Sequence, residues 1–221
     1  NCPSAIYKEN HETNKREEVW MQDLKNFDAS LYESERLKVS VRDKTKVPVS
    51  LVYKKGIDLK NSPLLIYGYG SYGAIIDAAF RTSIIPLLDR GFIFAIAHIR
   101  GGSEMGRKWY DDGKMLRKMN TFFDFIDVTK SLTNLNYGNK EQLFAMGGSA
   151  GGLLMGAVIN LEPELYKGII SAVPFVDVLT TMSDESIPLT TFEYKEWGNP
   201  ANEEEYNYIK QYSPYDNIKP S

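Results

Sequence analysis

Two hydrophobic patterns divide this chain, and the first covers roughly its initial third. There, ERLKVSVRD (35–43) and VPVSLVYKK (47–55) alternate apolar and polar side chains around a short charged turn. This period of two predicts a β-hairpin with one covered face. Residues 4–9 and 16–22 predict two more strands, and residues 23–34 predict a linker or crossover. Because two isolated strands are only marginally stable in water, we expect the earlier pair to belong to a larger sheet.

In the second pattern, short apolar runs alternate with helical segments. An uninterrupted run such as FIFAIAHIR (92–100) is typical of a strand buried on both faces of a parallel sheet. Residues 121–135 place one apolar face at helical spacing, made of Phe122, Phe125, Ile126, Thr129 and Leu132. Strands alternating with helices predict a doubly wound, mostly parallel α/β sheet. The other expected strands are PLLIYGYG, LFAMGG and GIISAVP, and the other expected helices are 80–91 and AGGLLMGAVINL.

The segment AMGGSAGG (145–152) joins an expected strand directly to an expected helix. It contains G-x-S-x-G, a short pattern that arises by chance in roughly one such chain in ten. The strand–turn–helix setting raises its value, because a nucleophilic serine is presented on such a turn. Ser149 is therefore the candidate nucleophile, and the backbone N–H of Ala150 would supply half of an oxyanion hole. The alternative is a glycine-rich turn that only packs tightly or binds a phosphate.

A serine nucleophile needs a base, and the usual base is histidine. Both histidines, His11 and His98, precede Ser149 in the sequence. His98 ends an apolar strand, where histidines are more often core residues, and we expect that role for it. Asp177 follows another expected strand and is a possible acid, although a structural role is expected. The loop RGGSEMG (100–106) is expected to pack backbone against backbone rather than bind phosphate, because no helix is expected directly after it.

Several phrases together resemble the prolyl oligopeptidase family of serine peptidases, from about residue 34 to the end and more loosely back to residue 4. They are LLIYGYGSYGA, DRGFIFAIAHIRGGSEMGRKWYDDGK, NTFFDFIDV, GGSAGGLLMGAVIN, VPFVDVLTTMSDESIPLTT, EWGNP and YSPYDNI. The resemblance implies an α/β-hydrolase fold with the triad order Ser, Asp, His. It implies that residues 23–221 are a partial peptidase domain, incomplete at the C-terminus and lacking the triad Asp and His. It also implies that residues 1–22 are the end of a β-propeller domain.

The resemblance assigns further roles in the catalytic site. Tyr69, the second tyrosine of YGYGSYG, would donate its hydroxyl to the oxyanion beside the N–H of Ala150. The residues alone leave a packing role for Tyr69 equally open.

A branch of this family cuts after Arg or Lys, using one acidic pair in each of two subsites. The chain keeps Glu193 and Asp77 but has Lys195 and Ala79 in the second positions. We therefore expect a weakened or altered preference for basic residues, with Lys195 repelling a substrate Arg or pairing with Glu193. The alternative is that these acids are solvated surface charges.

Composition limits the partners and cofactors. The chain of 221 residues has a net charge of −3 and no basic tract, so no nucleic-acid partner is expected. Its longest apolar runs are too short to cross a bilayer, so no membrane is expected. The single cysteine, Cys2, and the absence of a secretory signal fit a cytoplasmic protein. Without a His/Cys cluster at ligand spacing, no metal or other cofactor is expected.

The function expected is that of a serine endopeptidase or oligopeptidase acting on short peptides. Its partner would be the remainder of its own catalytic domain and the propeller, and this segment alone is expected to be inactive. One alternative is an esterase or lipase on the same fold. Another is a non-catalytic, peptidase-like binding protein, which the half-lost acidic pairs favour and the intact serine turn opposes.

Overall fold

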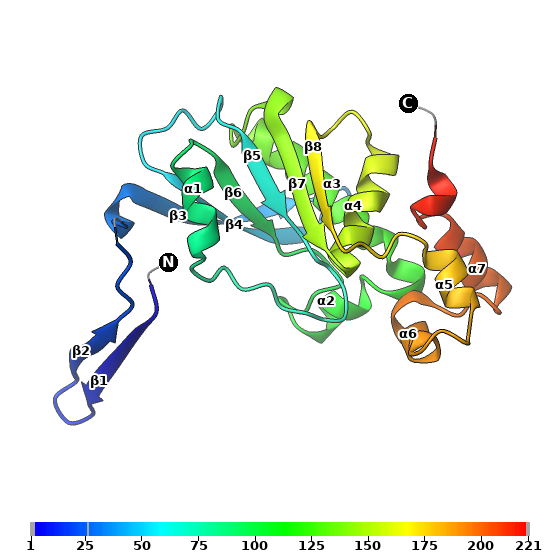
Figure 1. Ribbon diagram of the computed structural model, residues 1–221, viewed down its shortest axis with the longest axis horizontal. Coiled ribbons are helices and arrows are strands. Elements are labelled where there is room, and N and C mark those ends of the chain that lie inside the picture. Colours follow the sequence, from blue (N-terminus) through cyan, green and yellow to red (C-terminus); the bar gives the residue numbers. More distant parts are fainter. Residues whose placement is uncertain (1–2, 26, 220–221) are drawn as a thin grey trace.

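The computed structural model describes residues 3–25 and 27–219, so Cys2 lies outside the described residues. Its centre is a six-stranded sheet with the order β3-β4-β6-β5-β7-β8 (Figure 1). Strands β6, β5, β7 and β8 run parallel, while β3 and β4 form an antiparallel hairpin at one edge. The expected mostly parallel α/β sheet is confirmed. The strands are β3 (Tyr32–Ser40), β4 (Lys46–Lys54), β5 (Leu64–Tyr67), β6 (Ile93–Ala97), β7 (Leu143–Gly148) and β8 (Gly168–Ala172).

Alternate strand residues enter two separate cores. In β6, Ile93 and Ala95 are fully buried on the face that helices α3 and α4 cover, whereas Phe94 faces α1. Each large apolar side chain buried this way contributes about 1.5–3 kcal/mol. Both faces of the sheet are therefore covered, as its uninterrupted apolar strands predicted. The helices are α1 (Ile85–Leu88), α2 (Arg107–Asp111), α3 (Met119–Asn134), α4 (Ala150–Leu161), α5 (Val178–Ser183), α6 (Thr190–Trp197) and α7 (Glu203–Lys210).

The helix expected over 80–91 and the linker expected over 23–34 are both shorter than expected. The helix expected over 80–91 is reduced to a 3-10 turn at Thr82–Ile84 followed by the four residues of α1. Pro86 lacks a backbone donor, and Gly91 at φ +83° ends the segment. The linker expected over 23–34 stops earlier, because β3 already begins at Tyr32, opposite Lys54.

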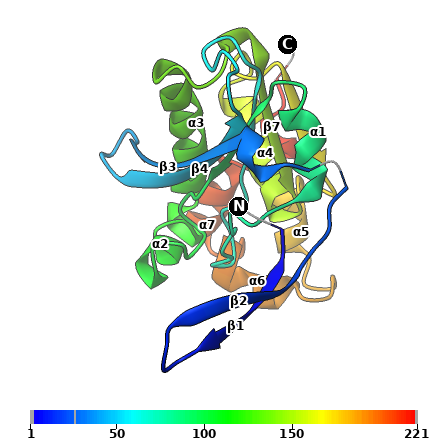
Figure 2. The same cartoon turned by 90° about the vertical axis from the view of Figure 1, so that its left-hand side faces the viewer.

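The first two strands form a sheet of their own. Strands β1 (Ala5–Asn10) and β2 (Lys15–Met21) pair antiparallel with each other, as expected, and neither pairs with a strand of the central sheet in the part of the chain that the structure describes. Ile6, Val19 and Trp20 are 59%, 61% and 49% exposed. Figures 1 and 2 show this hairpin projecting away from the rest of the molecule. Its membership in a propeller remains a prediction.

The parallel strands bring the candidate site together at one edge. Strands β5 and β7 are neighbours, with Tyr67 opposite Met146. Both therefore end at the same edge of the sheet, which places the loop after β5 beside the serine turn after β7. Within the described residues, no helix is long and apolar enough to cross a membrane.

Candidate active site

Ser149 occupies a strained backbone position between β7 and α4. Its dihedral angles are φ 56° and ψ −117°, far from helix geometry, and its side chain is exposed. The amide of Ser149 donates to the carbonyl of Ala172 at 2.9 Å, and its carbonyl accepts from Gly152 at 2.8 Å. A non-glycine residue in such a region costs about 1–3 kcal/mol. The bend therefore holds the hydroxyl outside the core, where a substrate can reach it.

The glycines of the turn are required by close backbone approaches. A Cβ at Gly147 would collide with the carbonyl oxygen of Gly151. A Cβ at Gly151 would lie 2.8 Å from the carbonyl oxygen of Gly68, in the loop after β5. At Gly148, by contrast, the nearest atoms would be 3.5 Å away or more, an ordinary contact. Gly147 and Gly151 are therefore required by the geometry of the turn, whereas Gly148 is not.

Tyr69 and Ala150 both adjoin Ser149. Tyr69 is half-buried, and a Cβ at Gly151 would lie 3.4 Å from its Cα. Burial raises the pKa of the Tyr69 hydroxyl above 10.0, and its interaction with Ser149 opposes that shift. The hydroxyl therefore keeps its proton at neutral pH and can donate a hydrogen bond. Ala150 is the first residue of α4, where amides have no acceptor within the helix. Two donors thus lie next to the serine.

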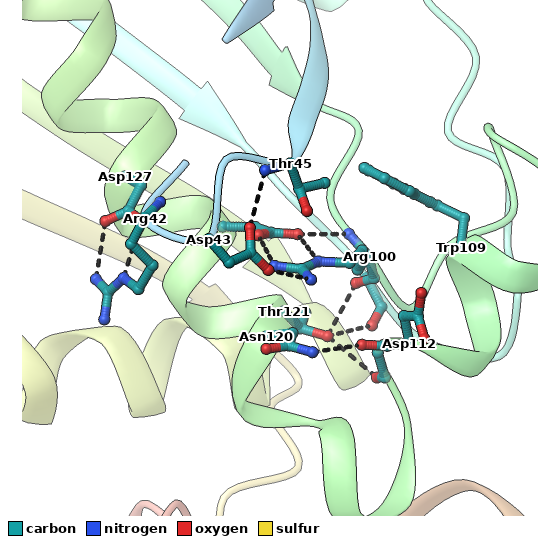
Figure 3. Close-up of polar contacts among 12 residues, drawn as sticks. Arg42, Asp43, Thr45, Arg100, Trp109, Asp112, Asn120, Thr121 and Asp127 are labelled. Atoms are coloured by element: carbon teal, nitrogen blue, oxygen red, sulfur yellow. Dashed lines mark hydrogen bonds and ion pairs between the residues drawn. The ribbon is translucent and has the colours of Figure 1, made fainter. Parts of the chain in front are cut away.

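The loop 100–106 packs against the loop that follows β5. Arg100 binds Asp124 through Nε at 2.8 Å and Nη2 at 2.6 Å, and binds Asp43 through Nη1 at 2.7 Å (Figure 3). A Cβ at Gly101 would collide with the carbonyl oxygen of Gly70. The expected packing role is supported, but the reason given for it was wrong, because α2 begins at Arg107, directly after the loop.

Glu193 lies on helix α6, beside the serine turn. Its Oε2 accepts from the Tyr72 hydroxyl at 2.8 Å and from Trp197 Nε1 at 3.1 Å. Trp197 packs on Phe175 with ring centroids 5.5 Å apart, and the Phe175 amide donates to the Ser149 carbonyl at 3.3 Å. The negative charge of Glu193 also contributes to the raised pKa of Tyr69. The structure therefore brings Glu193 close to the candidate catalytic residues.

The neighbours of Glu193 on α6 point elsewhere. Lys195 is exposed and forms no salt bridge among the described residues, so the pairing with Glu193 considered above is not formed. Glu196 is 3% exposed and faces inward. It accepts from the Tyr72 amide at 2.9 Å and the Tyr110 hydroxyl at 2.6 Å. Its burial was not predicted, because its partners are distant in the sequence.

Among the described residues, no hydrogen bond or ion pair links Asp77 to the serine turn. Its side chain is exposed. The amide of Ile76 donates to Glu104 Oε1 at 3.1 Å. Ala78 and Ala79 line a cavity of about 220 Å³ against β4, β6 and α1. A binding role for Asp77 therefore remains a prediction.

His98 is a core residue, as expected. It is 1% exposed, and its Nε2 lies 2.9 Å from Ser50 Oγ and 3.3 Å from Arg36 Nη1. Since arginine only donates, Nε2 accepts, and the ring proton of a neutral His98 is on Nδ1, which faces Glu104 Oε1 at 3.6 Å. Both ring nitrogens therefore face residues other than Ser149.

The other candidates for the proton chemistry are also occupied or remote. Asp177 caps α5 by accepting from the Thr180 amide at 3.3 Å. His11 is exposed in the turn between β1 and β2. Within residues 3–25 and 27–219, no hydrogen bond or ion pair joins a histidine to Ser149, and no cluster of His, Cys, Asp and Glu could hold a metal ion.

Comparison with known proteins gives consistent results. Residues 78–221 match the sequence profile described as "Prolyl oligopeptidase family". The chain is 55% identical to "Dipeptidyl aminopeptidase BI" of Pseudoxanthomonas mexicana over 219 residues, which is 98% of the chain and 30% of that protein. It is 53% identical to "Protease 2" of Moraxella lacunata over 194 residues, or 87% of the chain and 28% of that protein.

Solved structures extend the likeness to three dimensions. Oligopeptidase B from Leishmania major superposes with a TM-score of 0.92 at 48% identity, covering 99% of the chain and 31% of that structure. Oligopeptidase B from Trypanosoma brucei, in a closed form with covalently bound antipain, gives 0.92 at 47% identity over the same shares. The chain thus spans about three tenths of the length of these relatives.

Proposed function

Because this chain belongs to the prolyl oligopeptidase family and has its α/β-hydrolase fold, we propose that it carries the nucleophile of a serine peptidase. The whole enzyme would hydrolyse short peptides. The observation that carries this proposal is the exposed Ser149 at φ 56°, at the end of a central parallel strand. A relaxed, buried serine would not favour it.

In the proposed reaction, Ser149 Oγ attacks the carbonyl carbon of the scissile peptide bond. Its proton passes to a base, which then protonates the departing amine, leaving an acyl-enzyme. Water, deprotonated by the same base, releases the acid and restores the serine. The Tyr69 hydroxyl and the Ala150 amide stabilise the oxyanion formed in each half-reaction, a contribution of about 3–4 kcal/mol per donor.

The base and its acidic partner would come from parts of the protein beyond the described residues. Two observations support this. His98 is bound to Ser50 and Arg36, and the chain covers only 30% of the dipeptidyl aminopeptidase. The other proposed partner is the propeller to which the β1–β2 hairpin would belong. The apolar side chains exposed on that hairpin, Ile6, Val19 and Trp20, support this.

The proposed substrates carry a basic residue at the cleavage site, but with a weakened preference. The half-buried carboxylate of Glu193, close to Tyr69, supports recognition of a cation. Lys195 on the same helix and Ala79 in the other predicted subsite weigh against a strong preference. One relative is named as a dipeptidyl aminopeptidase, so removal of dipeptides from a free N-terminus is tested alongside internal cleavage.

The test uses the protein at the full length of its relatives. Peptidyl-coumarins with Arg, Lys or Ala before the scissile bond, each with a free or blocked N-terminus, are compared with p-nitrophenyl esters. We expect amide hydrolysis that Ser149→Ala lowers at least about 10⁴-fold and that Ser131→Ala, on α3, leaves unchanged. Turnover of esters alone would indicate an esterase instead. Peptide binding without turnover would indicate a binding protein.

A further inference from the structure

A lysine side chain lies in the interior against the two residues that follow Tyr69 in the sequence. Lys118, just before α3, is 1% exposed. Its Nζ donates to the Gly70 carbonyl at 2.7 Å and to Ser71 Oγ at 2.7 Å. The same atom lies 3.8 Å from Glu196 Oε1 and 4.9 Å from the centre of the Trp197 ring. Burying an ammonium is costly unless partners compensate, and the proposed reaction does not use this group.

The partners of Lys118 belong to two different elements of the site. Gly70 and Ser71 belong to the loop after β5, and Gly70 directly follows Tyr69 in the sequence. Glu196 and Trp197 belong to α6, which also carries Glu193. Lys118 therefore connects the loop that carries Tyr69 to helix α6, which carries Glu193.

The Gly70 carbonyl is held from several sides. Besides Lys118, Thr121 Oγ1 approaches it at 3.5 Å, and Gly101 packs so closely that a Cβ there would collide with it. Gly70 has φ +71°. Because glycine adopts positive and negative φ about equally, these contacts are what fix the direction of its carbonyl. A misplacement of about 1 Å in an active site can cost about 100-fold in rate. Because Gly70 directly follows Tyr69, we expect a shift of this carbonyl to move Tyr69 as well.

We propose that Lys118 is a positioning residue whose ammonium locks the Tyr69 loop to helix α6 and so fixes the oxyanion-binding hydroxyl relative to Ser149. The inference rests on the proposed function, in which that hydroxyl binds the oxyanion. Lys118 acts without touching the substrate. The proposal therefore predicts that its effect on kcat passes through Tyr69.

A double-mutant cycle tests that dependence. In the full-length protein, kcat and KM for a peptidyl-coumarin are measured for wild type, Lys118→Met, Tyr69→Phe and the double variant. We expect Lys118→Met to lower kcat about 30- to 100-fold, with KM changed less than about threefold. In the Tyr69→Phe background the same substitution should lower kcat less than about threefold. An equal loss in both backgrounds would overturn the proposal.

Two further variants keep the result unambiguous. Ser71→Ala removes one partner and leaves the charge in place, so it decides the question in the same cycle if Lys118→Met does not fold. Its expected loss is about 3- to 10-fold, again only when Tyr69 is present. Leu132→Ala, which opens a cavity under α3, should lower stability but not kcat per folded molecule.

Ser149→Ala separates this inference from the proposed function. If Ser149→Ala is inactive and the cycle shows no coupling, only the positioning role fails. If Ser149→Ala keeps its activity, the proposed function fails, and with it the positioning role.

Discussion

At the scale of single residues, the strain at Ser149 has a measurable consequence. Glycine accepts φ 56° without penalty, whereas alanine does not. We predict that Ser149→Gly raises the free energy of unfolding by about 1 kcal/mol and that Ser149→Ala leaves it nearly unchanged. Urea unfolding of both variants checks this. Equal stabilities would contradict a strained turn.

Lys195 is the residue most directly open to a test of specificity. Its side chain is exposed, two positions after Glu193 on the same helix. We predict that Lys195→Glu raises kcat/KM for an Arg substrate about 3- to 10-fold relative to an Ala substrate, since one partly screened charge contributes about 1 kcal/mol.

The control for that prediction is Lys140→Glu. It makes the same charge change in the turn that precedes β7, at the opposite end of this strand from Ser149. It should leave the ratio of Arg to Ala cleavage unchanged. An equal rise in both variants would mean that only net charge matters.

Which site residues the sequence predicted depends on how local their chemistry is. The strand–turn–helix setting of Ser149 and Ala150 was predictable, because the motif, the preceding strand and the following helix are contiguous, while their catalytic roles stay predictions. Glu196 and Lys118 were missed, because their partners are as distant as Tyr72, whose amide binds Glu196 across 124 positions. Nothing in the local sequence distinguishes these buried charges from surface ones.

At the scale of elements, the strand–turn–helix unit depends on two close backbone approaches. We predict that Gly147→Ala lowers the free energy of unfolding by more than about 2 kcal/mol, because its Cβ would collide with the Gly151 carbonyl. Gly148→Ala is the matched control, since its Cβ would make only contacts of 3.5 Å or more. Urea unfolding compares the two, and similar losses would refute this account of the turn.

Elements were predictable where one pattern dominates a long segment. The helix expected over 121–135 is α3, and all five residues of its expected face are buried. The helix expected over 80–91 was wrong in length, because apolar spacing does not report what Pro86 and Gly91 do to backbone hydrogen bonds. Where an element begins and ends therefore depends more on backbone hydrogen bonding and conformation than on hydrophobic spacing.

At the scale of the whole molecule, Lys118 links stability to pH. Burial lowers its pKa to about 8 from the ordinary 10.5, although attraction to Glu196 opposes this. Between these values the unfolded chain holds a proton that the native chain has lost. The free energy of unfolding therefore rises with pH between about 8 and 10.5, by up to about 1.4 kcal/mol per pH unit. This gain is lost as the pH falls back through about 8.

The measurement is urea unfolding at pH 8 and pH 10 for wild type and Lys118→Met. We predict that the stability of wild type rises relative to the variant between these pH values. Lys140→Met, which removes an exposed lysine, should follow wild type instead. A constant difference between wild type and Lys118→Met would show that the buried amine does not titrate in this range.

The central claim is that Ser149 is the nucleophile, and covalent labelling tests it most directly. The full-length protein is treated with a fluorophosphonate, digested, and mapped by mass spectrometry while peptide turnover is followed. We predict one adduct, on Ser149, formed in proportion to the loss of activity. Loss of activity with the adduct on another residue, or full turnover with Ser149 modified, would contradict the account.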